Sequence, residues 1–187
     1  MPSCVKSLKV LLWLSLSLAL SPAIANEYGI SIKHLELIRQ AETYKIDSEI
    51  DYQLSPTAKE ALEKGIPLTW DVQFEIRQPG FIWAKRIYKK RLRYTLQYHA
   101  LLKQYKVIGP DNHLEMFLSL TAALNYMASP LRGITLAAEQ LDSGKHYFLA
   151  MKTSFNRELL PVPLRPFAYL NRQWFLSSPW MIWPFQK

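Results

Sequence analysis

Cysteine is almost absent from the sequence. The only one, Cys4, precedes an apolar stretch, and residues 26–187 contain none. This excludes disulfides, thiol catalysis, cysteine zinc sites and iron–sulfur clusters from that part of the chain. Glycine-rich phosphate loops and the G-x-S-x-G and H-E-x-x-H motifs are also missing. No two of the four histidines, His34, His99, His113 and His146, stand at metal-ligand spacing. We therefore predict no catalytic residue, no metal site and no cofactor.

The sequence also lacks an apolar run of the roughly 20 residues that a transmembrane helix needs. Its longest, residues 10–20, follows Lys6 and Lys9 and precedes Ala23-Ile24-Ala25. A basic start, a short apolar core and an A-x-A site are typical of a secretory signal peptide. We predict a signal peptide at residues 1–25, cleavage after Ala25 and export to the periplasm of a Gram-negative bacterium. An uncleaved N-terminal anchor is the alternative.

Alternating apolar residues dominate the rest of the chain. In residues 44–54 and 68–77, every second side chain except Ser48 is apolar and the intervening ones are polar. This pattern predicts antiparallel strands with one buried face. Further strands are expected at residues 30–38, with a bulge, and at 92–102, 114–118, 131–136 and 147–155, with a bend near Lys103. Ser55-Pro56 and Ser119 begin two short helical patterns. The length suits one domain, residues 26–187. We predict a mainly β fold, a two-layer antiparallel, immunoglobulin-like β-sandwich with two short connecting helices.

The C-terminal segment, about residues 157–187, is rich in proline and tryptophan. Pro161, Pro163 and Pro166 interrupt regular structure. We expect Trp174, Trp180 and Trp183 to close the core. The alternative is that Trp180 and Trp183 make a peripheral contact with a membrane interface, where tryptophan is favoured.

Positive charge is concentrated in one short run. The formal net charge is +8, of which Lys6 and Lys9 supply two, and the run supplies the other six. Its basic residues are Lys85, Arg86, Lys89, Lys90, Arg91 and Arg93. Residues 81–83 before it are apolar, and we expect the run to begin as a loop and to end inside a strand.

Two interpretations of this run stay open. Positive charge can protect an edge strand from pairing with another sheet. Alternatively, the run is an anion-binding ridge, in which lysine and arginine contact phosphate or carboxylate groups while Trp83 or Tyr88 lies beside them. Arg91 and Arg93 share the solvent-facing parity. Because a signal peptide argues against nucleic acid, the expected partner is an envelope protein or an anionic lipid or glycan.

Several short motifs together resemble the exported proteobacterial proteins of domain-of-unknown-function family 4390. They are ALEKGIPL at residues 61–68, RYTLQYH at 93–99, QYKV at 104–107, SLTAAL at 119–124, LLPVPLR at 159–165, and Trp174 followed by SPW at 178–180. The resemblance implies an exported protein with no assigned activity. We expect a periplasmic binding or scaffolding protein, with an envelope hydrolase or an accessory of a membrane sensor kinase as alternatives.

Overall fold

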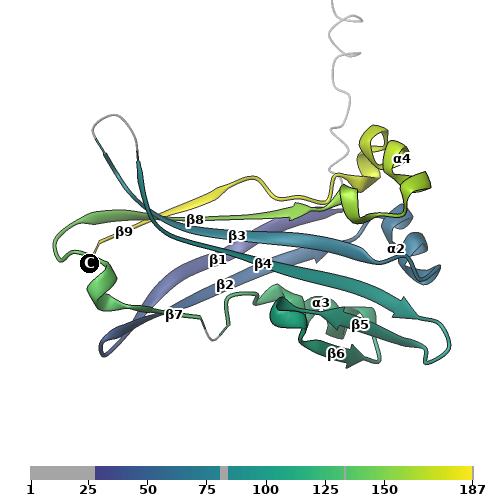
Figure 1. Cartoon of the computed structure of the whole chain (residues 1–187), viewed down its shortest axis with the longest axis horizontal. Coiled ribbons are helices and arrows are strands. Elements are labelled where there is room, and N and C mark those ends of the chain that lie inside the picture. The colour runs from purple at the N-terminus through teal and green to yellow at the C-terminus, as the bar shows by residue number, and fades with distance from the viewer. Residues whose placement is uncertain (1–27, 81–83, 133, 187) are drawn as a thin grey trace, which may run out of the picture.

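The computed structural model describes residues 28–80, 84–132 and 134–186 (Figure 1). The predicted signal peptide and Trp83 lie outside these ranges. The strands of the described part are β1 (Gly29–Gln40), β2 (Thr43–Gln53), β3 (Leu68–Gln78), β4 (Lys85–His99), β5 (Gln104–Ile108), β6 (Leu114–Phe117), β7 (Thr135–Ala137), β8 (His146–Phe155) and β9 (Met181–Gln186). Its α-helices are α2 (Pro56–Glu63), α3 (Leu120–Ala128) and α4 (Arg165–Leu170).

The strands form two antiparallel sheets. The small sheet has the order β1-β2-β7 and the large sheet has the order β6-β5-β4-β3-β8-β9. The Tyr52 ring of β2 meets the Trp70 ring of β3 edge-on, with 5.6 Å between centroids, so the sheets pack face to face. This confirms the mainly β, two-layer antiparallel sandwich. The strands divide three and six, whereas an immunoglobulin constant domain divides four and three.

The alternating patterns predicted the buried faces of both sheets. Tyr44, Ile46 and Ile50 are buried on β2, and Trp70 and Phe74 are buried on β3. Burial of each such side chain contributes about 1.5–3 kcal/mol. On β1, the register with β2 shifts between Ile32 and His34, where the sequence predicts a bulge. The layer between the sheets is therefore filled by apolar side chains.

The two predicted helices begin at the expected caps. The Ser55 hydroxyl accepts a hydrogen bond from the Ala58 amide at 3.2 Å, and the Ser119 hydroxyl accepts one from Ala122 at 3.1 Å. Gly65, just past α2, has φ of +80°, which favours glycine. The helices connect β2 to β3 and β6 to β7.

Three expectations about the chain were wrong. The basic run does not begin as a loop, because β4 starts at Lys85 and its backbone pairs with β3 from there on. The strand expected over residues 92–102 ends at His99, because the bend near Lys103 is a complete reversal that joins β4 to β5, with Lys103 at φ of +52°. The C-terminal segment is more regular than its prolines suggest, since it forms a third helix, α4, and an edge strand, β9, paired with β8.

Candidate anion-binding face

The outward side chains of β3 and β4 bring acids and bases opposite one another. Thr69, Asp71, Gln73 and Glu75 have the parity opposite to the buried apolar residues of β3. In the register with β4, Asp71 faces Arg93, Gln73 faces Arg91 and Glu75 faces Lys89. Directly opposite residues share a face of an antiparallel sheet. The outer surface of the large sheet therefore carries Lys89, Arg91 and Arg93 of the basic run.

A bulge adds Arg86 to this surface. The β3–β4 register shifts between Ile76 and Arg77, so that Ile76 faces Tyr88 while Arg77 faces Arg86. The extra residue of the bulge reverses the parity of β4 beyond Tyr88. Arg86 and Arg77 thus lie on the same face as Lys89, Arg91 and Arg93.

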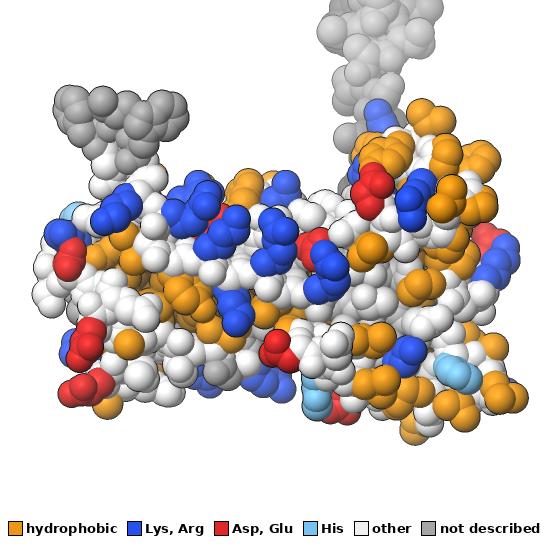
Figure 2. All heavy atoms as spheres, in the orientation of Figure 1, with side chains coloured by type: hydrophobic (Ala, Val, Ile, Leu, Met, Phe, Trp, Pro, Cys, Tyr) orange, Lys and Arg blue, Asp and Glu red, His pale blue; other side chains and the backbone are white. Residues whose placement is uncertain are grey.

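Strand β8 contributes one more cation from the other side of β3. Lys152 is the register partner of Gln73 on β8. We call the resulting set the basic face: Arg77, Arg86, Lys89, Arg91, Arg93 and Lys152. Figure 2 shows basic side chains in a row along the large sheet.

Two carboxylates lie within the basic face, and each is already paired. The Glu75 side chain is only 3% exposed, and its carboxylate lies 2.6 Å from Arg77 Nη2, 3.3 Å from Arg86 Nε and 3.9 Å from Lys89 Nζ. A buried carboxylate needs such partners. Glu75 therefore holds three of the cations at fixed positions.

Asp71 holds a fourth cation. Its carboxylate accepts hydrogen bonds from Arg93 Nε at 2.8 Å and from the Asn156 amide at 2.9 Å. Burial raises the pKa of Asp71, but the hydrogen bonds from Arg93 and Asn156 and the nearby charges of Arg93 and Arg91 outweigh it and lower the pKa below its usual value. Asp71 is thus ionised at neutral pH.

The cations outnumber the acids on this face. Six cations and two carboxylates leave a formal charge of +4. Among the residues that the structure describes, no carboxylate lies within 4.0 Å of the charged nitrogens of Arg91 or Lys152. These two flank the neutral Gln73. The surplus of charge is therefore centred on Gln73.

The sequence placed eight residues in one ridge, and the structure separates them. Arg86, Lys89, Arg91 and Arg93 share the basic face. Lys90 faces Phe74, and Lys85 faces Gln78, so both have the opposite parity. Tyr88 packs against Phe74, with 6.1 Å between ring centroids, instead of standing beside the cations. Trp83 lies outside the described residues.

Sequence reasoning missed Arg77 and Lys152. Arg77 ends the alternating pattern of β3 on its polar side, so its orientation was readable. The residues around Arg77 could not be predicted, because the alternating pattern does not reveal the bulge that brings Arg86 opposite it. Lys152 stands alone on β8, and only the pairing of β8 with β3 brings it beside Gln73.

The basic run also lies on an open edge of the sheet. Strand β5 pairs only with residues 95–99 of β4. In the part of the chain that the structure describes, no strand pairs with the outer edge of residues 85–94. The edge-protection interpretation therefore fits this geometry as well, and Lys85 and Lys90, which leave the basic face, suit that role.

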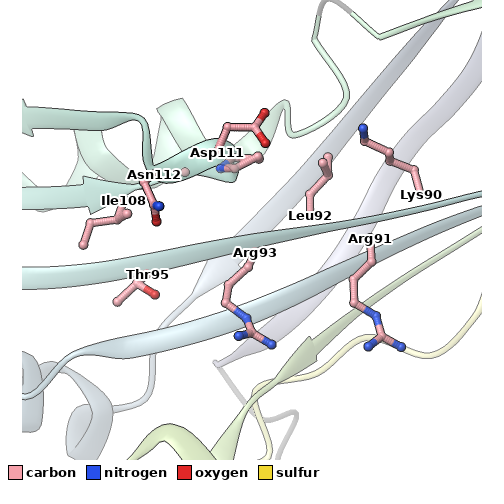
Figure 3. Close-up of a pocket in the computed structure, with 10 residues that line it drawn as sticks. Lys90, Arg91, Leu92, Arg93, Thr95, Ile108, Asp111 and Asn112 are labelled. Carbon is pink, nitrogen blue, oxygen red and sulfur yellow. The ribbon is translucent and has the colours of Figure 1, made fainter.

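A hollow of about 470 Å³ lies where β5 separates from β4. In Figure 3, Lys90 and Leu92 point from β4 toward the side where Asp111 and Asn112 lie, whereas Arg91 and Arg93 point the other way. Asp111 and Asn112 both have positive φ, +57° and +59°. Arg91 and Arg93 also belong to the lining of the hollow, so it adjoins the basic face and adds Lys90 and Asp111 beside it.

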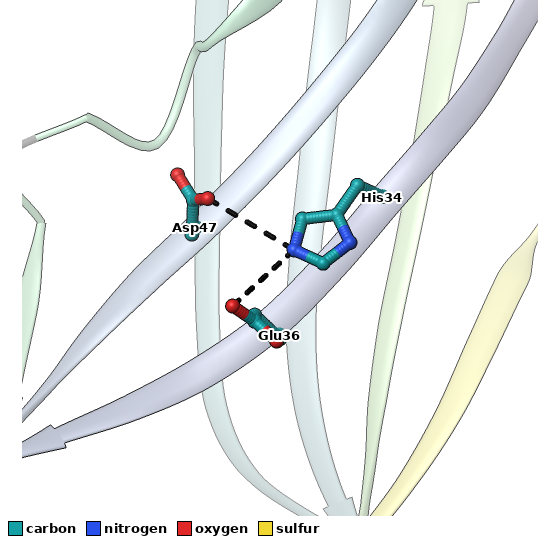
Figure 4. Close-up of side chains that lie close together, drawn as sticks. All are labelled: His34, Glu36 and Asp47. Atoms are coloured by element: carbon teal, nitrogen blue, oxygen red, sulfur yellow. Dashed lines mark ion pairs between the residues drawn. The ribbon is translucent and has the colours of Figure 1, made fainter.

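His34 forms a small cluster on the outer side of the small sheet. Its Nε2 lies 3.4 Å from Glu36 Oε1 and 3.9 Å from Asp47 Oδ2 (Figure 4). All three side chains are about half exposed. The cluster adds no support for a metal site, since exposed groups on paired strands form such ion pairs without a metal.

The two tryptophans considered for membrane contact differ in their surroundings. Trp183 faces Leu149 on β8 and packs against the core. Trp180 is partly exposed, and the Arg77 guanidinium lies over its ring at 5.3 Å. Trp174 is buried, as the core-closing prediction requires. No helix among the described residues is long and apolar enough to cross a membrane.

The fold and the basic face together define the class of this protein. It is a two-layer antiparallel β-sandwich with one basic outer surface. The chain belongs to the family described as Domain of unknown function (DUF4390), whose model matches residues 27–184. No curated protein and no solved structure matches the chain significantly.

Proposed function

We propose that this protein is exported to the periplasm of a Gram-negative bacterium and acts there as a binding or scaffolding protein. Its basic face docks an anionic envelope component or the acidic face of a partner protein. The observation that carries the proposal is the surplus of charge around Gln73, where Arg91 and Lys152 have no carboxylate in ion-pair range among the described residues.

The architecture of the face supports contact with an extended anion. Glu75 and Asp71 fix Arg77, Arg86 and Arg93 in place, so little side-chain entropy is left to lose on binding. Arginine presents parallel donors that match phosphate and carboxylate oxygens. The cations stand on a sheet surface and not around a deep pocket, and this suits a membrane surface, a polymer or a protein face better than a small molecule.

The test removes the two unpaired cations together. The buried core residues that the structure describes run from Ile30 to Leu176. The test uses residues 26–187, the chain that cleavage after Ala25 would leave. The probes are vesicles containing phosphatidylglycerol, for an anionic lipid, and polyglutamate, for an acidic protein face. Each cation near an anionic surface contributes about 1 kcal/mol, so R91Q/K152Q should bind at least one probe about 30-fold more weakly at low salt.

The matched control is K85Q/K90Q, which removes the same amount of charge from β4 at two positions outside the basic face. It should weaken binding by about threefold or less, because its charges act only from a distance. Equal losses in the two variants, or no loss in R91Q/K152Q with the fold intact, would contradict the proposal. The probe that responds tells whether lipid or acidic protein is the partner.

A further inference from the structure

The segment between β8 and β9 builds an exposed apolar surface. It folds as three 3-10 turns, Arg157–Leu159, Val162–Leu164 and Arg172–Trp174, around helix α4. One side of it is buried through Leu160, Ala168 and Trp174. The other side is exposed, with Val162 at 68%, Phe167 at 66% and Leu170 at 84%. We call the exposed set the apolar cap: Leu159, Val162, Phe167, Tyr169, Leu170 and Phe175.

The apolar cap is held in a defined conformation. The Ser55 hydroxyl donates to the Gln173 carbonyl at 2.7 Å, and the Thr57 hydroxyl donates to Gln173 Oε1 at 2.7 Å. Arg165 Nε donates to the Leu160 carbonyl at 2.8 Å. These bonds tie the segment to α2 and to itself. The apolar side chains are thus exposed on an ordered support, and such clusters mark interaction sites.

The charges within the segment that forms the cap are almost all positive. Residues 157–175 contain Arg157, Arg165 and Arg172, no lysine and no aspartate. The only acid, Glu158, accepts a hydrogen bond from the Tyr169 hydroxyl. The Arg157 guanidinium lies over the Tyr169 and Phe175 rings, at 5.3 and 4.5 Å. Aromatic and aliphatic side chains among arginines suit the boundary between lipid headgroups and acyl chains.

The described chain begins at the same end of the molecule. Gly29, at the start of β1, faces Gln53, which is two residues before Ser55. Ser55 in turn bonds the cap through Gln173. Figure 1 shows α2 and α4 together at this end. The residues before Gly29 include the apolar stretch 10–20, predicted to enter a membrane during export. Because cleavage after Ala25 would remove this stretch, it is the arginines among the apolar side chains of the cap that favour an anionic lipid surface over a protein as the partner.

We propose that the apolar cap is a membrane-docking site that inserts Val162, Phe167 and Leu170 into the interface of an anionic bilayer. Arg165 and Arg172 lie next to them in the chain and would meet lipid phosphates. The site shares no residue with the basic face and does not depend on its function.

The test measures co-flotation of residues 26–187 with vesicles of phosphatidylglycerol and phosphatidylethanolamine at about 0.5 M salt, where charge attraction is screened within a few Å. The wild-type chain should still be retained, because apolar insertion does not depend on salt. F167D/L170D should lower this retention at least about tenfold, since each inserted side chain gains from leaving water. The matched control is I38D/I182D, which changes two exposed apolar residues on other surfaces.

Circular dichroism and thermal melting establish whether each variant folds. If F167D/L170D does not fold, V162D, which lies in a separate turn, replaces it in the test. Wild-type retention by F167D/L170D or V162D would overturn the proposal. So would absence of wild-type retention at high salt, or a cap variant that binds vesicles normally but loses a co-purifying protein. The proposal on the basic face is separable, because R91Q/K152Q should weaken only the salt-sensitive part of vesicle binding.

Discussion

The basic face and the apolar cap are built in opposite ways. The basic face places charges on the flat outside of regular strands, where Glu75 and Asp71 pair with four of its cations. The cap places apolar side chains on short turns that are anchored from beneath by Trp174 and from the side by Ser55. We therefore expect binding by the face to depend on salt and charge, and binding by the cap to depend on the packing below it. Each of the following substitutions should affect the basic face and the apolar cap differently.

Trp174→Ala should have the largest effect and act mainly on the cap. Trp174 is 3% exposed, and its ring stacks on Phe155 with 5.8 Å between centroids. Removal of such a ring costs about 3–5 kcal/mol of unfolding free energy. Urea unfolding measures this loss. In the molecules that remain folded, high-salt vesicle retention should fall while polyglutamate binding is kept. Loss of both kinds of binding together would show that the two surfaces are not independent.

Glu75→Gln should affect the basic face alone. It should lower the stability of the fold and strengthen binding to anions. The amide keeps an acceptor but leaves Arg77, Arg86 and Lys89 without their shared negative charge. Because these cations are partly exposed, the expected loss of unfolding free energy is about 1–2 kcal/mol. The charge of the face rises by one, so binding to the anionic probe should tighten. Thermal melting and a binding titration measure the two effects, and weaker binding by a folded variant would contradict the account.

Asp71 should give the smallest effect, a small stabilisation at neutral pH that is lost in acid. Its folded-state pKa lies below the ordinary value of 3.8. A depressed carboxyl pKa stabilises the folded state at pH values above the unfolded-state pKa, and this stabilisation is lost as the pH falls through the folded-state pKa. The difference in unfolding free energy between wild type and D71N should therefore be under about 1 kcal/mol at pH 6 and shrink below pH 4. Urea titrations across this range check it. A difference that grows in acid would show that Asp71 does not stabilise the fold as an anion.

The two surfaces also differ in how much of each the sequence predicts. Alternation in residues 44–54 and 68–77 predicted the buried faces of β2 and β3, because period two has a single structural meaning. The basic run could be recognised in the sequence as a concentration of lysine and arginine. Its division into Arg91 and Arg93 on one side and Lys90 on the other follows from parity. The place of Arg86 depends on a bulge, and that of Lys152 on which strand pairs with β3.

The cap was hidden by its prolines and aromatics. Residues 157–175 contain apolar side chains at no regular period, so nothing separates the buried Leu160 and Trp174 from the exposed Phe167 and Leu170. The short turns that sort them are fixed by contacts with α2, such as Ser55 with Gln173, over a separation of 118 residues. Contacts of that range leave no signal in a local pattern.

Gln73→Glu tests the central claim most directly, because it removes no cation. The new carboxylate would stand between Arg91 and Lys152, its register partners on the two neighbouring strands, and pair with the surplus charge. The measurement is the affinity of this variant for the anionic probe that the wild type binds, with Gln53→Glu on the small sheet as the control of equal charge. The account predicts an affinity about tenfold lower for Gln73→Glu, with unfolding free energy unchanged or slightly higher, since each cross-strand pair is worth up to about 1 kcal/mol. Equal affinities of the two variants would contradict it.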